Sequence, residues 1–206
     1  MEHVELVIPA FTLYADTEIK VGRFTTSVSI VGWDPKSSSH NSEEMAEGRF
    51  FTKDSGSVMV LGYKIPEIFQ DTRHKRDRTP STKKQRIDTL HKTAKVTVTR
   101  VNDSGEKESK TLRVKIVGIV AEKGNTEDYS IYMPMQEVAK LNDWATHQTN
   151  TLKMQGYESL KVRVESTDKV DEVVNKITEM GYTAFSFKQM LDQLNQVFVI
   201  IQAVLG

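Results

Sequence analysis

Residues 197–206 form an apolar run, VFVIIQAVLG, in which one glutamine is the only polar side chain. The helical pattern before this run has a polar stripe, and within the run that stripe nearly disappears. A helix on a water-soluble core keeps a polar face, so the change indicates one helix that passes from water into lipid. The run is about half of the roughly 20 residues that span a bilayer, and we interpret it as the start of a truncated transmembrane helix. The alternative is a buried core helix, because apolar runs of about 10 to 14 residues are often core.

A capping signal predicts where this helix begins. Ser186 and Gln189 form a Ser-x-x-Gln capping box, in which the serine side chain satisfies a free backbone N–H of the first turn. We expect this helix to couple the domain to the membrane. The expected coupling residues are Ser186, Gln189, Leu191 and Leu194, and the expected membrane-entry residues are Val197, Phe198, Ile200 and Ile201.

The segment before this helix predicts a unit of strand, helix, strand and helix. Residues 160–164 alternate as a strand, and a helix then begins at Asp168. Gly181 supplies the left-handed residue that ends the helix, and residues 182–187 are predicted to form the next strand. The apolar face of the helix comprises Val170, Val173, Val174, Ile177 and Met180.

Two strand-rich segments near the N-terminus complete this arrangement. Residues 4–14 and 18–33 are rich in β-branched and aromatic residues, and residues 15–17 between them favour a turn, so we predict an antiparallel pair. Together with the C-terminal strands, the pair predicts a split α+β sandwich in which the chain ends meet and the middle is an inserted lobe. A helical turn is expected at 41–46, where Ser42 can act as the cap.

The middle of the chain predicts a lobe with its own hairpin. Residues 94–101 and 111–120 alternate as strands, and the sequence Asn-Asp-Ser-Gly at 102–105 favours a turn between them. Pro134 is expected to open a helix with apolar residues at three-residue spacing. The other predicted features are a strand at 57–61, one helical turn at 66–70, a strand at 130–133, and a helix face of Val138, Leu141 and Trp144.

Residues 71–88 interrupt the apolar pattern with a basic excursion that cannot bury a core face. The chain has 28 basic and 28 acidic residues, so a charged partner must be recognised by a local patch. The simplest interpretation is a solvated, mobile loop, and the alternative is contact with anionic lipid headgroups or a cell-wall polymer. Nucleic acid is disfavoured because the segment has no aromatic residues for base stacking. The candidate contact residues are Arg73, Lys75, Arg76, Lys83 and Lys84.

No set of residues in the sequence predicts catalysis. The absence of cysteine excludes disulfides and thiolate chemistry, and the glycine-rich nucleotide motifs and Gly-x-Ser-x-Gly do not occur. His40 with Glu43 and Glu44 is the one grouping to consider for a metal, but a solvated helix start explains it more simply. Trp33, Trp144 and the pair at 50–51 are expected to pack in cores or at lobe junctions. We therefore expect no enzyme activity, no cofactor and no metal.

Four segments, taken together with their order and spacing, resemble the core domain of MacB-type ABC-transporter permeases. They are EGRFFTKD at 47–54, VMVLG at 58–62, VKIVGIV at 114–120 and IYMPM at 131–135. The resemblance implies an α+β fold with a porter-like βαβ lobe built from both chain ends and an inserted, smaller α+β lobe of the Sabre-like type. The basic excursion departs from the compact run that the family has at this place.

We predict the inserted lobe at residues 56–150, and this division is similar to the family's, with residues 1–55 and 151–196 in the porter-like lobe. The resemblance concerns the function as well. It implies a domain on the extracytoplasmic face of the bacterial plasma membrane that transmits ATP-driven motion to the export or extraction of a peptide, drug or lipid-linked substrate. The implied partners are an ATP-binding subunit, a second permease copy, and an adaptor, membrane fusion protein or lipoprotein. The alternative function is an extracellular sensor or ligand-binding module that recruits a peptide, a lipoprotein or a cell-wall enzyme, and a deep apolar cleft between the lobes would favour it.

Overall fold

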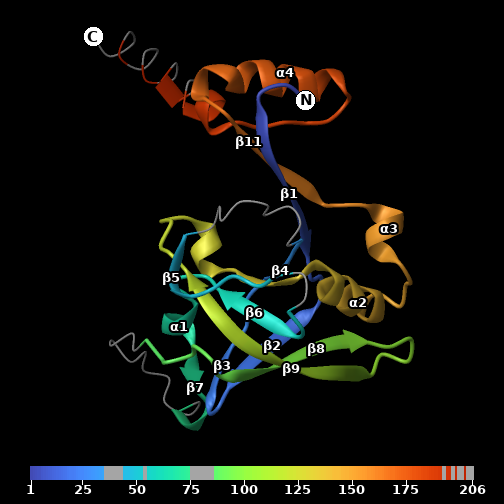
Figure 1. Ribbon diagram of the computed structural model, residues 1–206. Helices are drawn as coiled ribbons and strands as arrows, with labels where there is room; N and C mark the ends of the chain where they lie inside the picture. Colours follow the sequence, from blue (N-terminus) through green and yellow to red (C-terminus); the bar gives the residue numbers. More distant parts are fainter. Residues whose placement is uncertain are drawn as a thin grey trace. The chain divides into compact units, whose positions relative to one another are not determined.

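The computed structural model describes residues 1–34, 44–52, 55–74, 86–191, 194–195, 198 and 202. A mixed sheet with helices makes up the fold (Figure 1), which confirms the predicted α+β class. The sheet has the order β11-β1-β4-β10-β6-β9-β8-β2-β3-β7, and β5 also pairs with β9. The strands are β1 (Val4–Thr12), β2 (Asp16–Val21), β3 (Phe24–Thr26), β4 (Ile30–Trp33), β5 (Met45–Gly48), β6 (Val58–Leu61), β7 (Gln70–Asp71), β8 (Thr93–Val101), β9 (Lys107–Val120), β10 (Ile131–Pro134) and β11 (Ser159–Val164). The α-helices are α1 (Ile65–Ile68), α2 (Met135–Ala145), α3 (Thr151–Gln155) and α4 (Val170–Glu179), and short 3₁₀ turns lie at Thr72–His74, Thr126–Tyr129 and Thr167–Lys169.

The chain divides into two compact units, which we call the central unit and the terminal unit. The central unit comprises residues 8–160, and the terminal unit comprises residues 1–7 and 161–206. Strands β1 and β11 each contain residues of both units. The predicted lobes, with boundaries at 55/56 and 150/151, describe a different division of the chain, and that division stays a prediction.

A long hairpin organises the central unit. Strands β8 and β9 pair antiparallel along the whole of β8, as the alternating pattern predicted. The side chain of Asn102 closes the turn, because its Oδ1 accepts hydrogen bonds from the backbone N–H groups of Ser104 at 3.0 Å and Glu106 at 2.9 Å. Five inward side chains of these two strands are fully buried, namely Ala94, Val96, Val98, Val114 and Ile116. Alternation therefore leaves the opposite face of the hairpin to solvent.

Helix α2 covers part of the same core. It begins directly after Pro134 and contacts β4 and β10, which confirms the predicted helix. Val138 and Leu141 are buried, whereas Trp144 is half-buried and carries the Arg100 guanidinium 4.4 Å above its ring centroid. The three-residue spacing thus identified the buried stripe correctly.

The prediction of one continuous strand at 18–33 is wrong. The structure has three strands there, β2, β3 and β4, because Gly22 has a φ of 57° and turns the chain between the first two. The predicted antiparallel pairing with the N-terminal strand is made by β4 alone, in which Gly32 lies opposite Phe11 of β1. The prediction of strand structure for this segment was correct, but turns divide the segment into three strands.

The helical turn predicted at 41–46 is also wrong for the residues that the structure describes. Met45 and Ala46 belong to β5, which pairs antiparallel with β9, while Ser42 lies outside the described residues. Gly48 permits this pairing, because its φ is 71° and a Cβ there would lie 2.3 Å from the carbonyl oxygen of Val117. Main-chain pairing in the sheet therefore outweighs the local capping signal.

Four aromatic rings pack together in the central unit. The ring centroids of Trp33 and Phe50 are 5.3 Å apart, and those of Phe50 and Phe51 are 4.7 Å apart. Tyr132 meets Trp33 edge-on at 5.7 Å. Trp33 and Phe51 are buried, so these residues pack in the core as predicted.

In the terminal unit, α4 follows a 3₁₀ turn at Thr167–Lys169 and is ended by Gly181, whose φ is 86°. This confirms the helix predicted from Asp168. Val173 is its one residue that is buried, whereas Met180 at the end of the predicted apolar face is exposed. The backbone N–H of Glu165 donates to the carbonyl oxygen of His3 at 3.1 Å and joins the end of β11 to the N-terminal segment.

Candidate membrane-proximal site

The C-terminal part of the terminal unit exposes many apolar side chains. Phe185 is 92% exposed, and the other members of the group are between 43% and 70% exposed. The group comprises Met180, Tyr182, Phe185, Phe187, Met190, Leu191, Leu194 and Phe198. Exposed apolar side chains in this number are typical of a surface that meets a membrane or another protein.

Ser186 begins the predicted helix. Its Oγ accepts a hydrogen bond from the backbone N–H of Gln189 at 3.1 Å, and its carbonyl oxygen accepts one from Met190 at 3.2 Å. Residues 187–191 are helical, as are the described residues Leu194, Asn195 and Phe198. This confirms the part of the predicted capping box in which the Ser186 side chain accepts a hydrogen bond from the Gln189 backbone N–H.

The strand predicted at 182–187 is wrong. Residues 182–186 have neither helical nor strand structure, and helix begins at Phe187. The side chains of Tyr182 and Phe185 are exposed, and the described part of the chain pairs no strand with this segment. An apolar segment forms a strand only where a neighbouring strand supplies hydrogen bonds, and among the described residues no strand of the sheet pairs with this segment.

A charged contact attaches the start of this helix to α4. The Lys188 ammonium forms an ion pair with the Asp171 carboxylate, and both side chains are partly shielded from solvent. Asp171 lies in the first turn of α4, and Lys188 lies in the first turn of the following helix. The contact thus joins two consecutive helices of the terminal unit.

The predicted membrane-entry residues are only partly described. Phe198 is helical and 61% exposed, while Val197, Ile200 and Ile201 lie outside the described residues. Gln189, Leu191 and Leu194 of the expected coupling set all lie in the helical segment. Within the described ranges, no helix is both long and apolar enough to cross a bilayer.

The structure describes only the two ends of the basic excursion, which was predicted as a possible contact with an anionic surface. Arg73 is exposed, and its backbone N–H donates to the Asp71 carboxylate at 3.0 Å. Arg86 at the other end lies 4.8 Å from the Tyr63 ring centroid and 3.1 Å from a carboxylate oxygen of Glu47. The other candidate residues, Lys75, Arg76, Lys83 and Lys84, lie outside the described residues.

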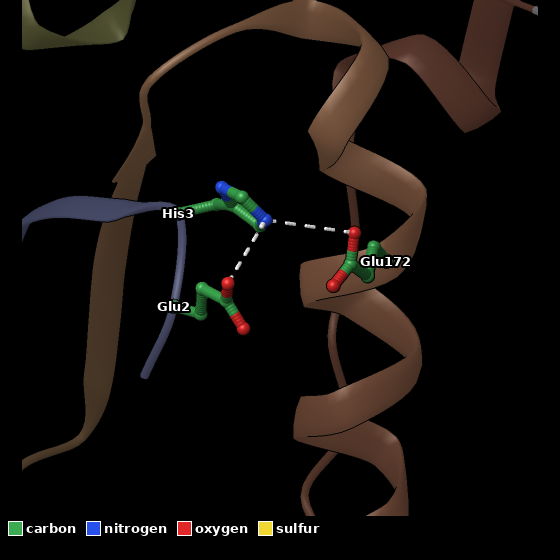
Figure 2. Close-up of side chains that lie close together, drawn as sticks. All are labelled: Glu2, His3 and Glu172. Carbon is green, nitrogen blue, oxygen red and sulfur yellow. Dashed lines mark ion pairs between the residues drawn. The ribbon is translucent and has the colours of Figure 1, made fainter.

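Three groups that could ligate a metal lie together in the terminal unit (Figure 2). His3 Nε2 is 4.0 Å from a Glu2 oxygen and 3.8 Å from a Glu172 oxygen, and His3 Nδ1 is 3.3 Å from Glu165. The Lys176 ammonium lies 2.8 Å from Glu172, and it holds the pKa of that carboxyl below its usual range. Contacts of His3 and Lys176 with these carboxylates therefore connect the N-terminal segment to α4.

Sequence reasoning did not find this cluster. Its members are separated by about 170 positions in the chain, and no local spacing signal connects His3 with Glu172. The grouping that the sequence did suggest, His40 with Glu43 and Glu44, depends on residues at 40 and 43 that lie outside the described residues.

Two solved structures are similar to this chain at low sequence identity. The extracellular domain of the noncanonic ABC-type transporter YknZ from Gram-positive bacteria is 14% identical, with a TM-score of 0.46 and coverage of 89% of this chain and 79% of that one. A domain of a protein described as a permease from Porphyromonas gingivalis is 12% identical, with a TM-score of 0.43 and coverage of 92% and 69%. No curated protein matches the sequence.

The sequence model of the family described as the MacB-like periplasmic core domain matches residues 1–180. This range includes all four segments that carried the resemblance, and the α+β fold agrees with it. The resemblance is therefore confirmed. The chain belongs to the family of MacB-like periplasmic core domains and is an extracytoplasmic domain of an ABC-transporter permease.

Proposed function

We propose that this domain transmits ATP-driven motion of the transporter to the export or extraction of a peptide, drug or lipid-linked substrate. In this proposal the motion enters through the helix that begins at Ser186 and reaches the rest of the terminal unit through α4. The observation that carries the proposal is the exposed apolar character of that helix together with its attachment to α4.

The spacing of the exposed residues supports a helical partner. Phe187, Leu191, Leu194 and Phe198 follow one another at intervals of four, three and four residues, and all four are exposed. Apolar residues at alternating intervals of three and four form the contact seam of a coiled coil. A partner helix along this seam would bury all of them and would move together with this helix.

The attachment to α4 supports the transmission of motion through this helix, because a helix without such contacts would move independently of α4. The Ser186 cap fixes the first turn, and the ion pair between Lys188 and Asp171 joins that turn to α4. A helix rises about 1.5 Å per residue, so in this proposal an unbroken helix from Ser186 to Phe198 would be about 18 Å long. A rigid rod of this length would carry a displacement from the membrane side into the folded domain.

The proposed partners follow from the transporter type. An ATP-binding subunit would drive the motion through membrane helices, a second permease copy would supply the facing domain, and an adaptor protein or lipoprotein would receive the substrate. The exposed seam and the exposed Phe185 are apolar surfaces that such partners would cover.

A proline substitution in the helix tests the proposal. Asn195 is helical and exposed, so Asn195→Pro breaks the rod without removing a core side chain, and Asn195→Ala is the matched control that preserves the helix. In the intact transporter, we expect Asn195→Pro to abolish substrate-stimulated ATP hydrolysis and transport, with basal hydrolysis retained. Full coupling in Asn195→Pro would contradict the proposal, as would equal loss in Asn195→Ala.

A further inference from the structure

A row of three like charges crosses the solvent face of the central sheet. Strand β8 lies between β2 and β9 (Figure 1), and the register places Lys20 opposite Lys95 and Lys95 opposite Arg113. Directly opposite residues point to the same face, and all three side chains are exposed. Since neighbouring strands are about 4.8 Å apart, the backbone positions of the three residues lie within a width of about 10 Å.

This row is not neutralised by the rest of the described structure. In the described ranges, none of Lys20, Lys95 and Arg113 forms an ion pair. Asp16 and Glu18 of β2 also lie on this face, opposite Thr99 and Thr97, and neither forms an ion pair with the row in the described structure. Like charges at directly opposite positions destabilise a sheet, so the arrangement opposes folding stability.

A small hollow with three more basic residues adjoins the row. It has a volume of about 290 Å³ and is lined by Gly48, Arg49, His91, Lys115 and Val117. Lys115 follows Arg113 on the same face of β9, two residues along the strand. The positively charged surface therefore continues from the row to the hollow.

The main chain holds the residues of the hollow in place. The backbone N–H of Arg49 donates to the carbonyl oxygen of Val117 at 3.0 Å, and that of His91 donates to Ile116 at 2.9 Å. His91 also has a φ of 62°, a conformation that few non-glycine residues adopt. Arg49, His91 and Lys115 are exposed and have no ion-pair partner among the described residues.

The remaining side chains of this face show what kind of partner it fits. Between the charged positions the face carries the hydroxyl groups of Thr93, Thr97 and Thr111, and the exposed Val101 lies at the hairpin end. Protein interfaces depend on several aromatic or aliphatic anchors, and Val101 is the one exposed apolar side chain among the described residues of this face. Strand β8 is paired on both sides, so an acidic peptide cannot add to it as a further strand. Recognition here must depend on charge along an extended ligand.

We infer that the solvent face of β2, β8 and β9, together with the adjoining hollow, binds a linear phosphate-bearing polymer. Phosphate groups repeated along such a chain would neutralise the Lys20, Lys95 and Arg113 row in succession and reach the hollow. The arginine guanidinium binds phosphate oxygens in bidentate fashion, and lysine ammonium groups add point charges. This surface lies in the central unit, and the inference does not depend on the proposed function.

Binding of inorganic polyphosphate to the purified 206-residue chain tests the inference. The variant Lys95→Gln/Arg113→Gln removes two charges from the row, and the control Lys140→Gln/Lys153→Gln removes two exposed charges from helices α2 and α3. We expect the first variant to bind at least about fivefold more weakly and to show a salt dependence whose slope is shallower by about 1.5. The control should bind like the unchanged chain.

The thermal unfolding midpoint separates loss of binding from loss of fold. Because the row is repulsive, Lys95→Gln/Arg113→Gln should unfold at the same or a higher temperature than the unchanged chain. Lys20→Gln, on a different strand, should reproduce part of the binding loss. Unchanged polyphosphate affinity in the row variants would overturn the inference. Stronger binding to poly-glutamate, or to phosphatidylglycerol vesicles, than to polyphosphate would also overturn it and assign the face to an acidic protein or a lipid surface.

Discussion

At the scale of single residues, Asp128 and Gly62 decide how the chain turns between β9 and β10. The Asp128 carboxylate is buried and accepts hydrogen bonds from the backbone N–H groups of Lys123 at 2.9 Å and Gly124 at 2.8 Å. Its own carbonyl oxygen lies against Gly62, where an added Cβ would come within 2.4 Å of it. The end of β6 and this turn can therefore approach so closely only because residue 62 has no side chain.

The variant Gly62→Ala should lower the free energy of unfolding by about 1 to 3 kcal/mol, because the new methyl group would meet backbone atoms that cannot move aside easily. Gly56→Ala is the matched control, since a Cβ at that position has open space around it. Urea denaturation of both variants measures the difference. Equal stability of Gly62→Ala and Gly56→Ala would show that the turn relaxes without cost.

At the scale of elements, α3 is held by a carboxylate that belongs to α2. Asp143 accepts hydrogen bonds from the Thr151 hydroxyl at 2.5 Å, from the Thr151 backbone N–H at 2.8 Å and from the Asn150 backbone N–H at 3.0 Å. The Thr151 hydroxyl is the main cause of a lowered pKa for the Asp143 carboxyl. Helix α3 was not predicted from the sequence, because five residues after a left-handed Asn150 give no usable periodicity.

The lowered pKa predicts an acid-sensitive contribution of Asp143 to stability. A carboxyl whose pKa is lower in the folded state stabilises the fold above its unfolded pKa of about 3.9, and this contribution is lost as the pH falls through the folded pKa. Asp143→Asn should therefore be less stable than the unchanged chain at pH 7, by about 1 kcal/mol, and the difference should shrink below about pH 4. Urea denaturation between pH 7 and pH 3 measures it, and a constant difference would contradict the assignment.

At the scale of the whole molecule, the main hydrophobic cluster belongs to the central unit alone. Every member of that cluster, from Phe11 to Leu141, lies within residues 8–160, and Val173 is the one buried apolar residue recorded in the terminal unit. The terminal unit instead carries partly exposed ion pairs such as Lys176 with Glu172, each of which contributes little to stability. The two units therefore differ in what stabilises them.

A fragment of residues 8–160 should fold by itself, because it contains this hydrophobic cluster together with strands β2 to β10. We expect cooperative thermal unfolding and a near-ultraviolet circular dichroism spectrum with the signature of ordered aromatic residues. The complementary fragment 161–206 should lack cooperative unfolding in water, since it buries so little apolar surface. If the fragment 8–160 binds hydrophobic dyes and unfolds without a cooperative transition, the hydrophobic cluster is not sufficient to fold the central unit.

Local sequence patterns correctly predicted the features that depend on neighbours in the chain. The hairpin around Asn102, the helix after Pro134, the helix ended by Gly181 and the cap at Ser186 all follow from alternation, helical spacing or turn chemistry, which act over a few residues. The four quoted segments also sufficed to identify the family. The features that local patterns could not predict depend on pairing between residues that are distant in the chain. The placement of Met45 in β5, the exposure of Tyr182 and Phe185, the network around His3 and the alignment of Lys20 with Lys95 and Arg113 each require a strand register or helix packing that no local pattern encodes.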